Sequence, residues 1–226
     1  MLNIAKHKQV LAKILIELAS EKKLAGKLGF KGGTALYLFY ELDRFSTDLD
    51  FDLTGEGGEV DRQLIKKIAA NNLAVQYERT KRFTWLWVGS YAKGQDKIKL
   101  EVNTRKYANE YEIKDFRGYS IRVLKPEFMF SHKLCAVLDR KKLQNRDLYD
   151  VWWMLKRGWG IAEPIVEMRM GKKLKSYWGD LLKLVRSLPK KYDILQGLGE
   201  VMTPAKKDWV KGRLLKELEM ELASRV

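Results

Sequence analysis

Three aspartates stand at alternate positions, Asp48, Asp50 and Asp52, in the segment DLDFDL. Because successive side chains of a strand point to opposite faces, this spacing predicts a strand with three carboxylates on one face and apolar Leu49 and Phe51 on the other. Two carboxylates about 6 Å apart repel each other by roughly 2 to 3 kcal/mol at an effective dielectric near 20. The strand therefore needs a cation or basic side chains nearby.

A pair of glycines, Gly32 and Gly33, lies upstream of the aspartates, directly before a helical pattern that runs from about Thr34 to Leu42. Glycines let the backbone approach a bulky anion closely, and the start of a helix presents free N–H groups and the positive end of its dipole. Thr34 adds a hydroxyl donor, and Lys31 is either a further positive charge or an exposed surface lysine. We interpret this turn as a phosphate-binding site.

Carboxylate oxygens are the ligands that Mg²⁺ prefers, and one or two acidic residues plus substrate phosphates are its usual ligands in phosphoryl-transfer enzymes. A metal-binding strand beside a phosphate-binding turn predicts a site for a nucleoside triphosphate. The alternative is a salt-bridge ladder in which Lys97 and Lys99 neutralise the aspartates. That alternative leaves the glycine pair unexplained.

The composition is that of a globular protein, with 46% hydrophobic residues in 226. A single cysteine, Cys135, excludes an internal disulfide framework and a cysteine-based zinc site, and it favours a reducing compartment. The two histidines, His7 and His132, exclude a histidine-rich metal site.

The chain is strongly basic, with 44 Lys and Arg against 29 Asp and Glu, a net charge of +15 and a pI near 9.7. This charge favours a polyanionic partner, with nucleic acid ahead of an acidic protein surface or a simple role in solubility. Charged residues interrupt the N-terminal apolar pattern, and no segment has the eighteen or more apolar residues of a membrane span. We expect a soluble, cytoplasmic protein with no membrane association.

Changes in hydrophobic period divide the chain into an α/β core over residues 1–125 and a helical domain over 126–226. In the first part, the patterns predict helices over 3–24, 34–42 and 61–72 and strands over 48–53, 82–91, 96–105 and 120–124. A turn at 91–95 joins the middle two strands. In the second part, helices are predicted over 126–142 and 145–158, followed by further helices after about residue 160.

The segments KGGTAL and RFSTDLDF resemble the AbiEii/AbiGii-type nucleotidyltransferase toxins, which belong to the polymerase-β-type nucleotidyltransferase superfamily. The segment HKLCAVLDRKKLQNRDLYDVWWML is similar to the helical motif of the same family. Together these motifs span most of residues 30 to 155. The resemblance implies a nucleotidyltransferase fold, in which helices flank a mixed sheet and a helical region follows.

The resemblance also implies roles for particular residues. Gly33 and Thr34 would lie at the phosphate turn, and Asp48 and Asp50 would bind Mg²⁺, or Mn²⁺ in its place. Glu101 is the candidate third carboxylate, because it faces away from the apolar residues of its predicted strand. We include Ser46, from RFSTDLDF, among the nucleotide-binding residues, together with Lys31 and Gly32.

In the helical domain the resemblance implies that Lys133 binds the triphosphate or nucleotide, that Asp147 is a later essential acid, and that the domain completes the active-site cleft. The alternative for Asp147 and its neighbours is an ordinary surface ion-pair set. Trp152 and Trp153 can stack a base, but adjacent aromatic residues of a helix cannot both face one way. Core packing is therefore the better interpretation for at least one of them.

These features predict an Mg²⁺-dependent enzyme that transfers a nucleoside monophosphate from an NTP to an acceptor hydroxyl. The charge favours RNA as the acceptor, and the resemblance suggests the tRNA 3′ end, in a toxin–antitoxin or abortive-infection system with a cognate antitoxin as partner. One alternative is a nucleotidyltransferase that modifies a protein hydroxyl. The other is a noncatalytic basic RNA-binding module.

Overall fold

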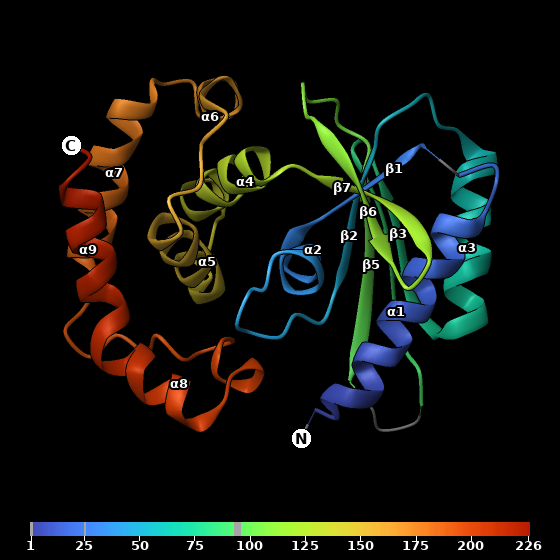
Figure 1. Cartoon of the computed structure of the whole chain (residues 1–226), viewed down its shortest axis with the longest axis horizontal. Helices are drawn as coiled ribbons and strands as arrows, with labels where there is room; N and C mark the ends of the chain where they lie inside the picture. Colours follow the sequence, from blue (N-terminus) through green and yellow to red (C-terminus); the bar gives the residue numbers. More distant parts are fainter. Residues whose placement is uncertain (1, 25, 93–95) are drawn as a thin grey trace. The chain divides into compact units, whose positions relative to one another are not determined.

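The structure is a computed structural model that describes residues 2–24, 26–92 and 96–226. The chain divides into two compact units, Met1–Leu124 and Lys125–Val226. Figure 1 shows the helices and strands of both units, coloured along the sequence from blue to red.

The first unit is built on a seven-stranded sheet in the order β3-β4-β5-β2-β1-β7-β6. The strands are β1 (Leu28–Lys31), β2 (Leu49–Leu53), β3 (Ala74–Lys81), β4 (Thr84–Ser90), β5 (Lys97–Asn103), β6 (Tyr111–Phe116) and β7 (Tyr119–Leu124). β1 pairs antiparallel to β2 and parallel to β7, while β2 pairs parallel to β5. The expected α/β class with a mixed sheet is confirmed.

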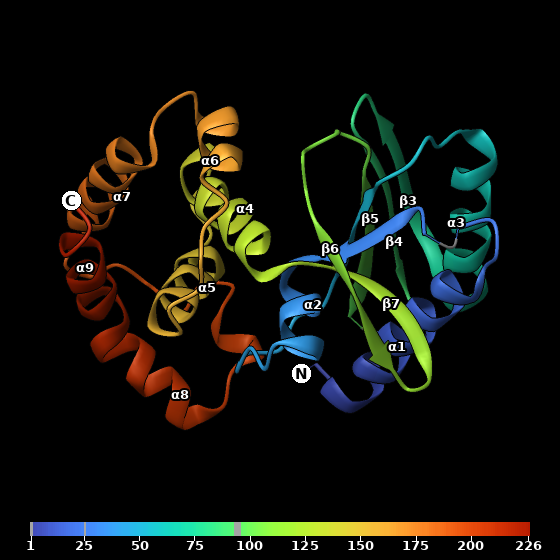
Figure 2. The ribbon, with the colours of Figure 1, turned by 45° about the horizontal axis from the view of Figure 1, so that its top comes forward.

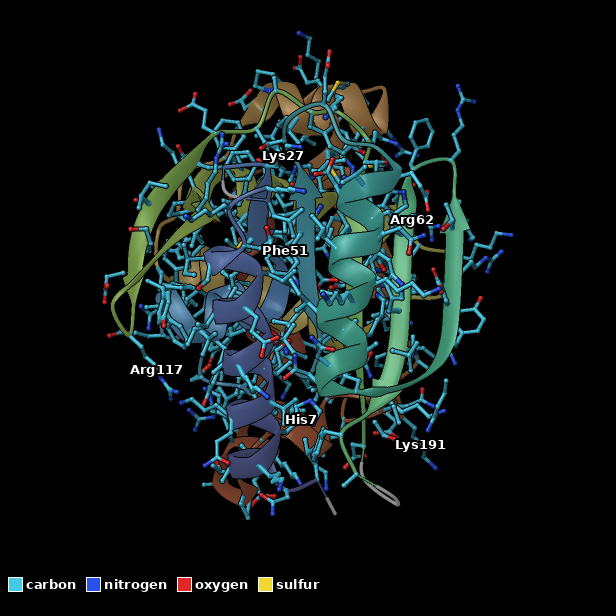
Figure 3. The ribbon with its side chains drawn as sticks, turned by 90° about the vertical axis from the view of Figure 1, so that its right-hand side faces the viewer. His7, Lys27, Phe51, Arg62, Arg117 and Lys191 are labelled. Atoms are coloured by element: carbon cyan, nitrogen blue, oxygen red, sulfur yellow. The ribbon has the colours of Figure 1, made fainter. Side chains whose placement is uncertain are left out.

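The helices of this unit are α1 (Ile4–Ser20), α2 (Gly32–Phe39) and α3 (Glu59–Asn72). Figure 3 shows α1 and α3 over one face of the sheet, with Phe51 of β2 beneath them. Leu49, Phe51, Leu100 and Val102 are buried on β2 and β5, whereas their neighbour Glu101 is half-buried. The predicted alternation therefore places the core on the apolar side of these two strands and leaves the other side polar.

Several predicted boundaries differ from the structure. β2 begins at Leu49, so Asp48 is the last residue of the preceding loop. Helix α2 begins at Gly32, not after the glycines, and ends at Phe39. The first helix ends at Ser20 instead of near residue 24. Part of the predicted turn at 91–95, residues 93–95, lies outside the described residues.

Strands β3 and β6 were not predicted. Both are outermost in the sheet, and most of their side chains are exposed or half-buried. An outer strand packs little apolar surface, so its sequence lacks the alternation of apolar and polar residues that identified β5.

The second unit is helical, as expected. It contains α4 (Pro126–Asp139), α5 (Asn145–Lys156), α6 (Glu163–Met170), α7 (Leu174–Ser187), a 3₁₀ turn (Gly199–Val201), α8 (Pro204–Trp209), a π-helical turn (Val210–Leu214) and α9 (Leu215–Ala223). Figure 2 shows these elements from a second direction. Helix α4 packs against α5 and α6, and α9 packs against α5 and α7. No helix in the described part of the chain is long and apolar enough to cross a membrane.

Trp152 and Trp153 both belong to the core of this unit, where they are 8% and 4% exposed. The indole N–H of Trp152 donates to Glu217 of α9, and its ring packs on Trp209. Trp153 packs edge-on against Trp159. Core packing is therefore confirmed for both tryptophans, and the base-stacking interpretation is wrong for them in this structure.

Candidate active site

The polar face of the sheet brings together residues from β1, β2 and β5. Strand register places Lys31 beside Asp50, and Asp50 beside Glu101. Because neighbouring residues in register point to the same face, these three side chains form one row across the sheet. The next row along the strands holds Asp52 and Asn103.

The two glycines lie directly against this row. Gly32 has a φ of +80°, which favours glycine, and a Cβ at this position would lie 2.5 Å from Oδ2 of Asp50. A Cβ on Gly33 would lie 2.6 Å from Oγ of Ser46 and 3.2 Å from Nη2 of Arg44. The start of α2 therefore approaches Asp50 and Ser46 more closely than any side chain would allow.

The loop before β2 is held in place by contacts from two helices. The hydroxyl of Thr34 donates to the carbonyl oxygen of Asp48. Nε2–H of His7, on α1, donates to the carbonyl oxygen of Thr47 at 3.0 Å. His7 is fully buried and packs edge-on against Phe45 (Figure 3 labels His7). These bonds fix the backbone that carries Asp48 beside the start of β2. The Thr34 hydroxyl therefore bonds within the protein.

Arg44 is a component of the site that was not predicted from the sequence. Its side chain is only 4% exposed, and Nη1 donates to the carbonyl oxygen of Phe45 at 3.1 Å. A buried guanidinium beside a glycine turn is suited to binding phosphate oxygens. The sequence signal was its place in RFSTDLDF, but arginine is normally exposed, and nothing in the pattern indicated its burial.

Asp52 has a structural role that was not foreseen. It is 3% exposed, and Nζ of Lys31 lies 2.5 Å from Oδ1. Asn103 donates to Oδ1 at 2.8 Å, and Asn109 donates to Oδ2 at 3.1 Å. This carboxylate is compensated by neighbouring side chains, and the pairing directs the ammonium of Lys31 to Asp52.

Tyr111 of β6 completes the contacts around Asp52 by reaching past β7 and across β1. Its hydroxyl donates to Oδ2 of Asp52 at 3.0 Å. Burial and the charge of Asp52 raise the pKa of this phenol above its usual range. The ring passes over Gly29, where a Cβ would lie only 2.1 Å from Cε1 of the tyrosine. Gly29 is therefore required for Tyr111 to reach the carboxylate.

Lys99 lies among the remaining acids, as the salt-bridge alternative anticipated. Its Nζ is 2.7 Å from Oε2 of Glu101. Burial lowers the pKa of Lys99, but the charges of Asp50, Glu101 and Asp48 outweigh this effect and raise it overall. Lys97, the other lysine of that alternative, is exposed.

Within the described residues, no group of three or more Asp, Glu, His or Cys side chains is arranged to hold a metal ion. The expected set of Asp48, Asp50 and Glu101 is therefore not gathered in this structure, in which Glu101 pairs with Lys99.

The second unit contains its own acidic cluster, on α4 and α5. Nζ of Lys133 lies 2.7 Å from Asp150 and 3.5 Å from Asp147, and both carboxylates are fully buried. Nε of Arg140 is 2.9 Å from Oδ2 of Asp147, an oxygen that accepts no hydrogen bond from the described residues. The surface ion-pair alternative is therefore wrong for Asp147 and Asp150.

His132 and Cys135, also on α4, are packing residues. Cys135 is fully buried, and burial raises the pKa of its thiol to about 11. Nδ1 of His132 accepts a hydrogen bond from Arg169 at 2.8 Å. These contacts hold α4 against its neighbours.

Comparisons with known proteins agree with this fold. The family model described as nucleotidyl transferase AbiEii toxin, type IV toxin–antitoxin system, matches residues 13–191. No curated protein sequence matches the chain.

The solved structures that are similar to the chain include the following two. JHP933 from Helicobacter pylori is 24% identical, and the match covers 100% of this chain and 96% of that one with a TM-score of 0.56. The nucleotidyltransferase toxin MenT4 from Mycobacterium tuberculosis is 20% identical, with coverage of 97% and 84% and a TM-score of 0.62. At these identities the two structures establish the fold alone.

Replacing Lys133 with methionine should lower the free energy of unfolding by about 3 kcal/mol, because two buried carboxylates lose a shared cation. Lys172→Met is the matched control, since its pair with Asp180 is solvent-exposed and should contribute little to stability. Urea denaturation followed by tryptophan fluorescence measures both values. Equal losses in the two variants would contradict this account of the α4–α5 cluster.

Proposed function

Because the chain belongs to the nucleotidyl transferase AbiEii toxin family of type IV toxin–antitoxin systems, we propose that it transfers a nucleoside monophosphate from an NTP to an acceptor hydroxyl and releases pyrophosphate. Family membership makes the chain a nucleotidyltransferase toxin and implies an antitoxin as its partner. The observation that carries the proposed chemistry is the close approach of the Gly32 backbone to the Asp50 carboxylate.

The residues at this position fit a divalent cation. Asp48 and Asp50 supply hard carboxylate oxygens at the start of β2, and the glycine backbone leaves room for an anion beside them. We propose that these two aspartates hold Mg²⁺, or Mn²⁺ in its place, and that Glu101 becomes a third ligand when it leaves Lys99. A bound metal would neutralise charge on the phosphates and activate the acceptor oxygen.

The chain's own groups would bind the triphosphate. The first N–H groups of α2, at Gly33 and Thr34, have no partner within the helix and can donate to phosphate oxygens. The hydroxyl of Ser46 and the guanidinium of Arg44 lie beside Gly33 and can donate to the same anion. Lys31 supports this turn through its ion pair with Asp52.

Lys133 and Asp147 remain proposed functional residues of the second unit. The 3.5 Å contact between them supports a role in which Asp147 orients the lysine ammonium and Lys133 binds the triphosphate or nucleotide. Because the same contact stabilises the unit, activity measured for variants at these positions must be compared with their stability.

We propose RNA as the acceptor, with the tRNA 3′ end as the hydroxyl, and the net charge of +15 supports a polyanionic substrate. A second support is a surface of the first unit that we name the Phe83 cluster: Arg82, Phe83, Arg105 and Tyr107. The guanidinium groups of Arg82 and Arg105 lie 4.9 and 4.7 Å from the Phe83 ring, and Arg105 donates to the Tyr107 hydroxyl. Arginine planes and aromatic rings are the groups on which unpaired RNA bases stack.

Incubation with each α-³²P-labelled NTP, Mg²⁺ and total tRNA tests the chemistry. Label should reach RNA with the wild type and with Asp115→Ala, an exposed aspartate on β6 of the same sheet. Asp48→Ala/Asp50→Ala should label RNA at least about a thousandfold less, because charge on the transferring phosphoryl group is no longer offset.

Undiminished labelling by the double variant would contradict the site. Label on added cell protein in place of RNA would favour the protein-modifying alternative. No label, together with RNA binding that persists in EDTA, would favour the noncatalytic binding module.

Arg82→Ala/Arg105→Ala should weaken binding to single-stranded RNA about tenfold and flatten its salt dependence, because two phosphate- or base-contacting cations are lost. Arg117→Ala is the control for Arg82→Ala and Arg105→Ala made singly: this exposed arginine also lies over a ring, Phe116, but at the β6–β7 turn on the opposite edge of the sheet (Figure 3). Fluorescence anisotropy at several salt concentrations measures both effects. Equal weakening by the control would show only a general charge effect and would contradict the Phe83 cluster.

A further inference from the structure

Lys99 is a cation built into the acidic face of the sheet. The parallel register pairs Leu49 with Leu100 and Asp50 with Glu101, so Lys99 continues the β5 ladder toward Asp48. Its Nζ lies 2.7 Å from the carboxylate of Glu101, and its side chain is 35% exposed. The lysine is therefore positioned beside the same carboxylates to which the proposed function assigns a metal.

The need for such a cation follows from the charges. Asp50 and Glu101 place two negative charges on paired positions of β2 and β5, and Asp48 adds a third in the residue before β2. Asp52 has compensating partners of its own, including the ammonium of Lys31, so that this lysine is already engaged. Lys99 is the group that the structure shows in contact with Glu101, and its long-range attraction extends to both aspartates.

We propose that Lys99 is the resident counter-cation of this site, which stabilises the acidic face when no divalent metal is bound and competes with the metal for Glu101. This inference rests on the proposed function, because it assumes that Asp48, Asp50 and Glu101 are the metal ligands. Metal binding requires the ammonium to leave Glu101. The lysine thereby sets the divalent-cation concentration at which the site fills.

Lys97 provides a matched control within the same strand. It lies two positions before Lys99, so its side chain points to the same face, but it is exposed at the end of β5. Removing either lysine lowers the net charge of the protein by one unit. A difference between the two variants therefore reports on position and not on total charge.

The test compares Mn²⁺ binding to the full-length wild type, Lys99→Met and Lys97→Met by isothermal titration calorimetry. Lys99→Met should bind Mn²⁺ about tenfold more tightly than the wild type, because a competing positive charge a few ångströms away is gone. Lys97→Met should stay within about twofold. In EDTA, Lys99→Met should melt at a lower temperature than the wild type, and saturating Mn²⁺ should remove that difference.

If the wild type and Lys99→Met bind Mn²⁺ with the same affinity, the proposed role of Lys99 is wrong, and the proposed metal site still stands. An equal increase in Mn²⁺ affinity in Lys99→Met and Lys97→Met would also contradict the role of Lys99, since total charge would then explain the change. Absence of Mn²⁺ binding in every variant would overturn the metal site itself. If Lys99→Met does not fold, Lys99→Arg and Lys99→Gln replace it: the arginine should keep the wild-type affinity and the glutamine should raise it.

Discussion

Electrostatic repulsion among carboxylates on one face of the sheet is the constraint on which the rest of the first unit depends. Asp52 is compensated inside the protein by an ammonium, two amides and a phenol, and Gly29 is a glycine because the phenol must cross β1 there. Glu101 is compensated by Lys99. Asp50 lies against the glycine turn and Asp48 lies two residues before Asp50, and a cation and a phosphate bound there would each offset the charge of the other. Asp52 thus organises the fold, while the proposed chemistry rests on Asp48, Asp50 and Glu101.

The second unit uses buried charge in a different way. Asp147 and Asp150 are fully buried on α5, and the ammonium of Lys133, on α4, forms ion pairs with both carboxylates. Such a cluster is strongly destabilised by loss of one partner, so it restricts which substitutions the helical unit tolerates. The motif that predicted functional roles for Lys133 and Asp147 also forms, in this chain, the buried ion pairs that hold α4 against α5. If a substitution at these positions abolishes activity, loss of the proposed functional group and loss of stability are separate causes, which a stability measurement distinguishes.

The sequence predicted those parts of the fold that a local pattern determines. Strict alternation identified β2 and β5 and the orientation of Glu101, and the glycine pair marked the start of α2 to within two residues. The partners of Asp52 were not predictable, because Asn109 and Tyr111 lie 57 and 59 residues away along the chain. Arg44 was missed because burial of an arginine depends on the loop packing and has no local signature. The outer strands β3 and β6 lacked an alternation of apolar and polar residues, because an outer strand packs little apolar surface.

The most direct test of the central claim, that Asp48 and Asp50 form a metal site beside the Gly32–Gly33 turn, is anomalous X-ray scattering from crystals grown with Mn²⁺ and a nonhydrolysable NTP analogue. We expect a manganese peak about 2.2 Å from oxygens of both aspartates, with the phosphates on the N–H groups at the start of α2. A manganese peak bound elsewhere, or an analogue whose phosphates lie away from this turn, would contradict it.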